Sequence, residues 1–441
     1  MRAFYLKEYD KVTCSSDGHP QQVEHGVLLL KDDFDSLKKT LLAADEAGKD
    51  AGKVLKLCSL QGQEAIQVQN YVGVILLPSG NCLEVLPKIC INQDDDYTVT
   101  AERILLKILR VLPDFPPMPF AEASLNHGKL ALLEVFIKCF LQDVGSLIRR
   151  GICSDYVGQE DNLNFLRGKL LLKEHIQHNT VRRDKFYVAY DEFLPDRPEN
   201  RLVKSALHAV LHISRNAKSR ILCKRYLSHF AGVGRAKNVA LEFIKCRKDR
   251  NMQHYTRTLQ WCEMLLRGNS PLPSFGKFGC QSILFSMHKL FEDYVAVKMR
   301  DVAAAAGWEF TSQMSGQSLV EEHDGNSRFA LRPDLFFSRS GQRLIADTKW
   351  KVVNSSRDID QGDLYQLFAY TEKYIAPGSY KLCFLVYPKT SQSPKLPPFY
   401  FRTKDSELRA AWYDLETDEC ELTSYLHSSI VSGHDEMAML S

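Results

Sequence analysis

The segment spanning residues 331–353 constrains the fold more than any other part of the chain. It reads LRPDLFFSRSGQRLIADTKWKVV, two apolar runs on either side of the dipeptide Ser340-Gly341. Glycine readily takes the positive backbone angles that a tight hairpin turn requires. Apolar runs that flank such a turn are typical of paired strands. We therefore predict an antiparallel hairpin with strands at residues 331–337 and 343–353.

The turn also sets which residues of the two strands face each other. A hairpin centred there pairs Phe336 with Ile345, which suits two apolar side chains. The same register places Asp334 opposite Asp347, with their Cβ atoms roughly 5 Å apart. Two carboxylates that close repel each other unless a cation lies between them. The hairpin therefore predicts a cation site at these two acids.

Lys349 adds a basic group to the two acids. Asp347 and Lys349 are two positions apart on a strand, so their side chains project from the same face. Phosphodiester hydrolysis needs a divalent metal with oxygen ligands, and a nearby lysine can orient the water or stabilise the developing charge. We predict that Asp334 and Asp347 bind Mg²⁺ and that Lys349 is catalytic. The backbone carbonyl of Thr348 is a further candidate ligand.

An ordinary hairpin with surface charges is the alternative interpretation of this segment. It accounts easily for Lys349. It accounts less well for two acids and a lysine that share one face directly after an apolar run. We therefore favour the catalytic interpretation.

Two predicted helices carry further candidate residues. Glu292, in HKLFEDYV, lies on the helix before the hairpin and can supply a third carboxylate to the metal. Gln366 and Tyr370, in DLYQLFAY, are four positions apart on one helix face and can hold the substrate backbone or support Lys349. The alternatives are a solvated position for Glu292 and plain packing for the other two side chains.

The pattern of the whole chain indicates an α/β multidomain protein with three regions. Residues 1–97 are β-rich, residues 98–272 are mainly helical, and residues 273–441 alternate helices and strands in the manner of an α/β domain with a mixed sheet. Breaks at residues 94–96 and 270–275 separate the regions. We predict helices at 32–46, 101–112, 130–149, 201–215, 281–300 and 363–374, a hairpin at 71–89 and a strand at 380–387.

Charge is distributed unevenly along a chain whose net charge is only +3. Residues 215–257 contain twelve Lys or Arg against two acids. This stretch is either a solvated helical face or a surface that follows a nucleic-acid backbone. We leave both interpretations open.

Other features exclude several classes of protein. The twelve cysteines contain no C-x-x-C pair, so we interpret them as reduced core residues rather than zinc ligands or a disulfide framework. The spacing of His175 and His178 can suit zinc, but no third ligand is evident. No signal core and no bilayer-length apolar stretch occurs, so we expect a cytoplasmic protein without a membrane partner. The sequence also lacks a G-x-x-x-x-G-K-[ST] phosphate loop, so any nucleotide-driven motor must be another chain.

At the candidate site the sequence resembles the PD-(D/E)xK nuclease superfamily. RPD and ADTK match its metal-binding pattern, with Asp as the second acid, and QLFAY is similar to the QxxxY helix motif of its RecB-like branch. The rest of the chain resembles one family within it, McrC, the nuclease subunit of McrBC-type modification-dependent restriction systems. The matching segments are VGVILLPSGNCLEVLPKI, RRGICSDYV with NFLRGKL, and YDEFLPDRPENRLVKSAL.

This resemblance implies an endonuclease subunit of a GTP-dependent restriction complex in antiviral defence. McrC proteins bind a hexameric AAA+ GTPase, McrB, through their N-terminal part and stimulate its GTP hydrolysis. GTP is therefore expected on the partner, and Mg²⁺ (with Mn²⁺ as a substitute) on this chain. The substrate would be double-stranded DNA, usually with a modification that McrB recognises.

Two other functions remain open at this stage. One is a stand-alone RecB-like nuclease for DNA repair or processing, which needs no partner. The other is a non-catalytic activator of a motor that keeps only a vestigial nuclease fold. The intact set of Asp334, Asp347 and Lys349 argues against the second alternative.

Overall fold

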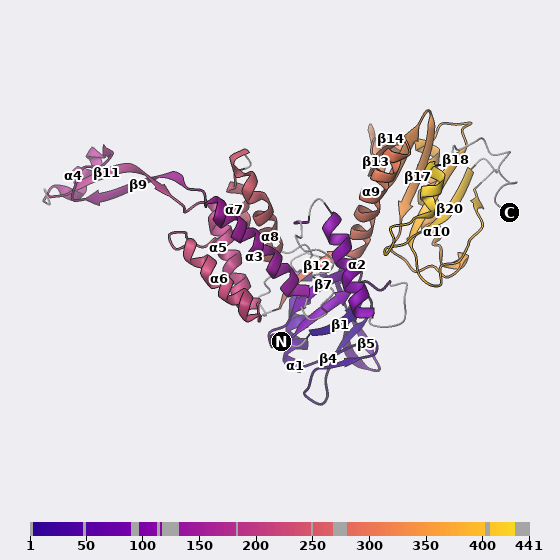
Figure 1. Cartoon of the computed structure of the whole chain (residues 1–441), viewed down its shortest axis with the longest axis horizontal. Coiled ribbons are helices and arrows are strands. Elements are labelled where there is room, and N and C mark those ends of the chain that lie inside the picture. Colours follow the sequence, from indigo (N-terminus) through magenta and orange to yellow (C-terminus); the bar gives the residue numbers. More distant parts are fainter. Residues whose placement is uncertain are drawn as a thin grey trace.

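The computed structural model shows an elongated molecule (Figure 1). The N-terminal sheets lie in its centre. A helical group with a long projecting arm extends to one side, and a C-terminal α/β domain lies on the other. The structure describes residues 3–46, 50–89, 97–112, 115–116, 132–181, 184–247, 250–267, 280–401 and 406–427.

The described part of the N-terminal region is rich in strands. The helix α1 (Lys31–Glu46) covers the predicted residues 32–46. The strands here are β1 (Ala3–Lys7), β2 (Lys11–Cys14), β3 (Gln21–Val23), β4 (Gly26–Leu29), β5 (Leu55–Leu60), β6 (Gln63–Val68), β7 (Tyr71–Leu76) and β8 (Cys82–Leu86), with a 3-10 turn η1 (Ala51–Lys53). Strands β7 and β8 form the predicted hairpin.

A strand from much later in the chain completes one of the two N-terminal sheets. Residues 281–286 form β12 (Gln281–Ser286), which pairs antiparallel with β7 in the order β1-β8-β7-β12. The helix predicted over residues 281–300 is therefore wrong for its first six residues. Gly73 permits the pairing, because a Cβ atom there would lie 2.2 Å from the carbonyl oxygen of Ile283. The other sheet has the order β3-β4-β2-β6-β5.

The middle region has the predicted helices. The prediction at residues 130–149 corresponds to α3 (Leu132–Arg150), which Gly151 ends with a positive φ of 93°. The remaining helices are α2 (Tyr97–Val111), α5 (Pro198–Ile213), α6 (Ala217–His229), α7 (Val239–Lys245) and α8 (Thr256–Arg267), with a 3-10 turn η3 (Arg250–Tyr255).

A projecting arm interrupts this region and was not predicted. Strands β9 (Asp155–Leu163) and β11 (Phe186–Leu194) pair along their whole length, and β10 (Lys169–Leu170) and α4 (Leu172–Asn179) lie between them in the chain. The mainly helical assignment of residues 98–272 is wrong here. Neither face of the arm packs against a core, so its strands lack the apolar alternation of half-buried strands.

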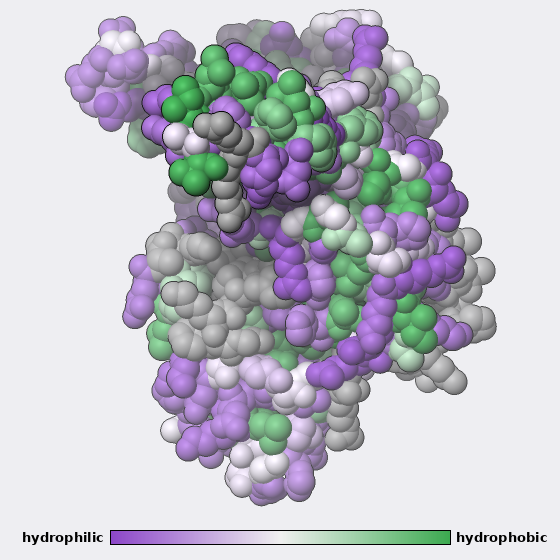
Figure 2. Space-filling model, turned by 90° about the vertical axis from the view of Figure 1, so that its left-hand side faces the viewer, coloured by the Kyte–Doolittle hydropathy of each residue, from purple (hydrophilic) through white to green (hydrophobic). Residues whose placement is uncertain are grey.

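The tip of the arm exposes apolar side chains. Figure 2 looks onto that end and shows hydrophobic residues among hydrophilic ones on the part nearest the viewer. At the other end of the arm, where it joins the helical group, Tyr156 and Phe193 pair across the strands and are exposed, although their rings lie 5.1 Å apart. The other large exposed apolar residues of the arm are Phe165, Leu166, Leu172, Ile176 and Val181.

The C-terminal domain has the predicted mixed sheet. Its order is β13-β16-β17-β18-β20-β19, with parallel pairing only where β18 meets β17 and β20. The elements are α9 (Met287–Ala305), β13 (Glu309–Ser312), β14 (Gln317–His323), β15 (Asn326–Leu331), β16 (Leu335–Arg339), β17 (Gln342–Thr348), η4 (Ser356–Asp358), α10 (Gln361–Tyr374), β18 (Lys381–Pro388), β19 (Phe399–Tyr400), β20 (Ser406–Tyr413) and α11 (Glu421–His427).

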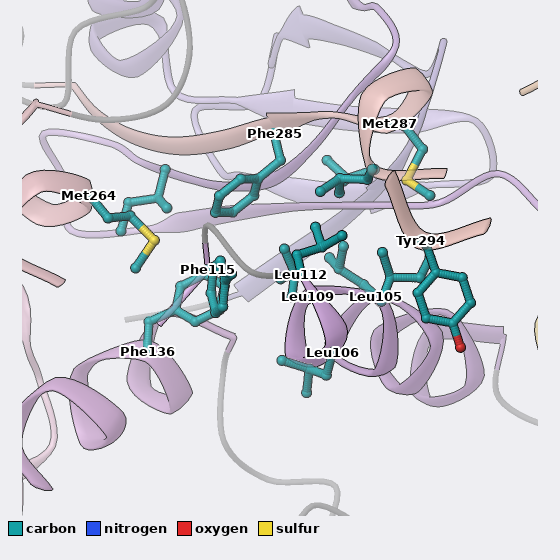
Figure 3. Close-up of a cluster of buried hydrophobic side chains, with 14 of the residues drawn as sticks. Leu105, Leu106, Leu109, Leu112, Phe115, Phe136, Met264, Phe285, Met287 and Tyr294 are labelled. Carbon is teal, nitrogen blue, oxygen red and sulfur yellow. The ribbon is translucent and has the colours of Figure 1, made fainter. Parts of the chain in front are cut away.

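One hydrophobic core connects the three regions. Figure 3 shows side chains of α2, α3, α8, β12 and α9 in contact, among them Leu109, Phe136, Met264, Phe285 and Tyr294. Strand β12 continues directly into α9, so the chain passes from the N-terminal sheet into the C-terminal domain without a spacer. The breaks predicted at residues 94–96 and 270–275 lie outside the described residues.

The basic segment of residues 215–257 does not lie beside the candidate site. Figure 1 shows α6 and α7 on the other side of the N-terminal sheets from β17 and α10. Some of its cations serve local contacts, such as Arg220 with the carbonyls of Leu211 and Ser214. A role in binding nucleic acid therefore gains no support from proximity to the site.

Three exclusions from the sequence can be compared with the structure. Every cysteine in the described residues is a free thiol. His175 and His178 stack on Phe186 and Tyr187. None of the helices in the described part of the chain combines the length and hydrophobicity needed to cross a bilayer.

Candidate active site

The β16–β17 hairpin positions the candidate acids. It pairs Leu335 with Ala346 and Phe336 with Ile345, so the register predicted from the Ser340-Gly341 turn is confirmed. Asp334 lies one residue before β16, just outside the paired strands. The hydrogen bonds between the paired strands therefore do not fix Asp334, and its position depends on side-chain contacts.

Asp347 and Lys349 face each other at the end of β17. Asp347 is 1% exposed, and its Oδ2 lies 2.6 Å from Lys349 Nζ. Within the described residues, that oxygen has no hydrogen-bond partner beyond this ion pair. Burial and the nearby charge of Asp334 raise the pKa of Asp347 to about 7, although Lys349 acts in the opposite direction. The predicted arrangement of these two residues on one face is confirmed.

Asp334 is held by the backbone and hydroxyl of Thr348. Its Oδ2 accepts hydrogen bonds from Thr348 N and Oγ1, both at 2.8 Å. The side chain of Thr348 therefore orients one candidate ligand, a role that the sequence did not suggest. The predicted role of the Thr348 carbonyl stays a prediction.

Gln313 connects Asp334 with Glu292. Its Nε2 donates to Glu292 Oε1 at 2.5 Å and to Asp334 Oδ1 at 2.9 Å. Its backbone N–H also donates to the Asp334 carbonyl, and its φ is 50°, an uncommon value outside glycine. Gln313 thus occupies the space between two acids, where a cation would also be attracted.

Glu292 lies on α9 and reaches the same group of residues. Burial raises the pKa of Glu292 to about 7, with further contributions from Asp334 and Asp293. The structure therefore brings Glu292 beside Asp334, as the sequence expectation required. Whether it binds metal stays a prediction.

Helix α10 supports Lys349 through a chain of hydrogen bonds. Lys349 Nζ donates to Gln366 Oε1 at 3.0 Å, and Gln366 Nε2 donates to the Tyr370 hydroxyl at 2.6 Å. Tyr370 in turn donates to the carbonyl of Arg332 at 3.0 Å. Of the two roles predicted for Gln366 and Tyr370, this geometry fits the support of Lys349.

The sequence did not single out Asp363 as a member of the site. Asp363 Oδ1 lies 3.6 Å from Lys349 Nζ, and its Oδ2 lies 2.8 Å from Lys351 Nζ. Its position in the first turn of α10, on the same helix as Gln366, was the available signal. Gln313 offered no signal, because it follows a short exposed strand without a motif.

The donor chemistry of the site fits a hard divalent cation. Asp334 and Asp347 supply carboxylate oxygens, and Asp347 Oδ2 is buried without a well-directed donor. However, no three Asp, Glu, His or Cys side chains of the described chain are grouped as a ready metal site. The carboxylates are held instead by Lys349, Thr348 and Gln313, so a cation would have to take over some of these contacts.

A cleft opens onto part of the site. It has a volume of about 610 Å³ and lies between α2, β12, α9 and β13. Its wall includes Glu292, Gln313 and Asp334, together with the cations Lys289 and Arg300. Substrate can therefore approach these acids from the side of α9.

Comparison with known proteins identifies the family. A family model described as the McrBC 5-methylcytosine restriction system component matches residues 66–388. The chain belongs to this family. The match runs from β6 to the end of β18, and so includes the middle region and the candidate site of this McrBC family member.

One solved structure shows the same fold. A chain in the half-complex of a tetradecameric assembly of Thermococcus gammatolerans McrB AAA+ hexamers with bound McrC is 17% identical, with a TM-score of 0.67. The similarity covers 96% of this chain and 98% of that one. A chain of the cryo-EM structure of the Thermococcus gammatolerans McrBC complex is 19% identical, with a TM-score of 0.49 over 68% of this chain and 88% of that one. No curated protein matches the sequence.

Proposed function

We propose that this McrBC family member is the nuclease subunit of its restriction system, a Mg²⁺-dependent endonuclease of the PD-(D/E)xK type. The observation that carries the proposal is the group of Asp334, Asp347 and Lys349 at one end of β17. The buried Asp347 beside Lys349 costs free energy that an ordinary surface hairpin would avoid. Buried and perturbed acids of this kind gather at functional sites.

In this proposal, different side chains have different roles in phosphodiester hydrolysis. Asp334 and Asp347 would hold Mg²⁺, with Glu292 and the Thr348 carbonyl as further ligands. When bound, the metal supplies Lewis acidity to the phosphate and acidity to a water. Lys349, whose direction is fixed by Gln366 and Tyr370, presents its ammonium group to the charge that develops on the phosphate. The water oxygen forms the new bond to phosphorus, and the ester oxygen leaves.

The partner in this proposal is a McrB-like AAA+ GTPase hexamer. The solved relatives of this fold come from assemblies of McrB hexamers with bound McrC. The exposed apolar residues of the β9–β11 arm support a partner contact, because soluble chains rarely leave such groups uncovered. GTP would be bound by the partner, and the DNA would be double-stranded and modified.

A reconstituted cleavage assay tests the nuclease assignment. The chain, its GTPase partner, GTP and Mg²⁺ are incubated with methylated DNA. We expect cleavage to require all of these components, and Asp347→Ala to abolish it while GTPase stimulation persists. Asp301→Asn is the matched control, because Asp301 is an exposed acid on the same helix as Glu292.

The two other functions are separate outcomes of the same assay. Robust Mg²⁺-dependent degradation by the isolated chain would indicate a stand-alone nuclease. Full cleavage with Asp347→Ala would show that the assignment is wrong. A non-catalytic activator has one observation in its favour, since the acids are held by protein groups rather than grouped as a metal site. That function predicts partner stimulation without cleavage by the wild-type chain.

A further inference from the structure

A buried contact joins the first strand of the molecule to the residue after the candidate catalytic lysine. Trp350 Nε1 donates to both carboxylate oxygens of Glu8, at 3.0 Å and 2.9 Å. Glu8 is 4% exposed and Trp350 is 1% exposed. The two residues are 342 positions apart in the chain. This contact therefore depends on the tertiary fold and joins the N-terminal sheet to the candidate site.

The N-terminal sheet holds Glu8 firmly in place. Glu8 directly follows β1, and Lys88 follows β8, the neighbouring parallel strand. The backbone N–H of Lys88 donates to Glu8 Oε2 at 3.0 Å. A carboxylate buried this deeply is costly unless donors surround it. Two N–H donors from different regions offset part of that cost.

Trp350 lies between the two sides of the candidate site. It follows Lys349 in the chain, and its ring packs against Phe291, with ring centroids 5.3 Å apart. Phe291 precedes Glu292 on α9. Any shift of the Trp350 ring would therefore move Lys349 through the backbone and Glu292 through the packing of Phe291.

The N-terminal sheet thus reaches the site by two routes. One route is covalent, because β12 in this sheet continues into α9 and so sets the position of the helix that carries Glu292. The other route is the hydrogen bond from Trp350 to Glu8. The first fixes α9, and the second fixes the segment after β17.

We propose that Glu8 is a positioning residue for the nuclease site, acting through Trp350 to hold Lys349 and Glu292 in their relative places. This inference rests on the proposed nuclease function. Glu8 itself does not touch the reacting atoms. It makes the geometry of the site depend on the state of the N-terminal sheet.

Substitution of Trp350 by Phe tests this proposal most cleanly. Trp350→Phe keeps an aromatic ring against Phe291 but removes the N–H that Glu8 accepts. Trp308→Phe is the matched control, because Trp308 is also buried in the C-terminal domain and donates to the carbonyl of Leu426 at 2.9 Å. Both variants lose the N–H of one buried indole, which reaches two carboxylate oxygens in Trp350 and one carbonyl in Trp308. Both should melt at a lower temperature than wild type, with the larger decrease for Trp350→Phe, so cleavage is compared well below both melting temperatures.

Of these two variants, only Trp350→Phe should cleave DNA more slowly than its lower stability alone would explain. In the complex with the GTPase partner, we expect Trp350→Phe to lower kcat for DNA cleavage roughly tenfold. The KM for DNA and the stimulation of GTP hydrolysis should stay within about twofold of the wild-type values. Cleavage by Trp350→Phe at the rate of Trp308→Phe would overturn the proposal.

A second pair of variants tests whether Glu8 acts through Trp350. Glu8→Gln keeps one acceptor oxygen for two N–H donors, so its cleavage rate should lie between those of wild type and Glu8→Ala. The double variant Glu8→Ala with Trp350→Phe should be no slower than the slower single variant. Additive losses would contradict the proposed route.

These outcomes are distinct from a failure of the nuclease assignment. If Asp347→Ala cleaves normally, the proposed function is wrong whatever the Glu8 variants do. If Asp347→Ala is inactive while the Glu8 and Trp350 variants cleave like Trp308→Phe, the nuclease function stands and the positioning role is wrong.

Discussion

At the scale of single residues, the site is organised by neutral side chains as much as by charged ones. Thr348 and Gln313 hold the two oxygens of Asp334, and Gln366 directs Lys349. Each of these neutral groups donates or accepts in a fixed direction. These directional hydrogen bonds restrict the side-chain conformations of the acids and the lysine more than electrostatic attraction alone would.

The hydroxyl of Tyr370 can be tested for its contribution to this support. Tyr370→Phe removes the acceptor of Gln366 and leaves Gln366 free to rotate away from Lys349. We expect cleavage by the complex to fall roughly tenfold, the effect of losing a hydrogen bond of about 1.4 kcal/mol. Tyr365→Phe is the control, because Tyr365 is an exposed tyrosine on the same helix. Equal rates for the two variants would contradict the support of Lys349.

Removal of the Gln313 amide tests how much this side chain stabilises Glu292 and Asp334 in the absence of metal. In Gln313→Leu, Glu292 and Asp334 lose their shared donor. Because Gln313 lowers the pKa of Glu292, the variant should be less stable by about 1 kcal/mol at pH 8, where Glu292 is ionised. The loss should shrink near pH 5.5, where Glu292 is protonated. Urea unfolding at both pH values measures this, with Gln317→Leu on the exposed strand β14 as the control.

At the scale of elements, the strand β8 is buried on both faces and nevertheless carries an acid, Glu84. Glu84 is fully buried and accepts a hydrogen bond from Leu132 N at 2.9 Å, and the described residues provide no donor for its Oε2. Burial raises the pKa of Glu84 to about 7, and the charge of Glu102 contributes. The strand therefore favours a protonated Glu84.

The stability of the chain should reflect this protonation. Because the pKa of Glu84 is higher in the folded state, the folded chain binds more protons between pH 4.5 and 7, and stability falls as the pH rises through this range. Glu84→Gln, which cannot ionise, should be more stable than wild type at pH 8, by on the order of 2 kcal/mol. Below pH 4.5 the difference should disappear. If wild type were more stable than Glu84→Gln at pH 8, ionisation of Glu84 would not destabilise the folded chain, and the account of Glu84 would be wrong.

Sequence patterns predicted those elements whose apolar residues meet a core. The register of β16 and β17 followed from one turn, and Gln366 and Tyr370 followed from helical spacing. The arm strands escaped prediction because, in the described residues, they do not pack on a hydrophobic core and so lack the apolar alternation of half-buried strands. Strand β12 escaped because its partner, β7, lies more than 200 residues earlier, and no local pattern records that pairing.

The same limit applies inside the site. Asp334 and Asp347 are close in the chain, and a turn was enough to bring them together. Gln313, Glu8 and Trp350 reach their contacts through strands and helices that pack across the molecule. Their roles depend on tertiary structure, so no motif in the sequence could indicate them.

At the scale of the whole molecule, the candidate nuclease domain and the arm lie at opposite ends of the long axis (Figure 1). The N-terminal sheets lie between them and contact the site through Glu8 and α9. A partner that binds the arm would therefore lie away from the candidate catalytic residues, at the far end of the molecule. This arrangement suits a subunit whose motor is a different chain.

The arm provides a test of that division. Tyr156→Ser with Phe193→Ser removes two exposed aromatic rings without touching the core. We expect stimulation of the partner's GTP hydrolysis to fall at least roughly tenfold, because exposed apolar side chains lose the area that a partner would bury. The melting temperature should not change. Phe329→Ser, an equally exposed aromatic on β15, should leave stimulation intact.

Binding of Mn²⁺ to the purified chain tests the central claim most directly. Titration calorimetry with wild type, Asp347→Asn and the surface control Asp301→Asn separates the site from other acids of the chain. The account predicts that wild type and the control bind Mn²⁺ alike, and that Asp347→Asn binds at least roughly tenfold more weakly. Equal binding by Asp347→Asn and wild type, or no binding by any of the three, would contradict a metal site at Asp334 and Asp347.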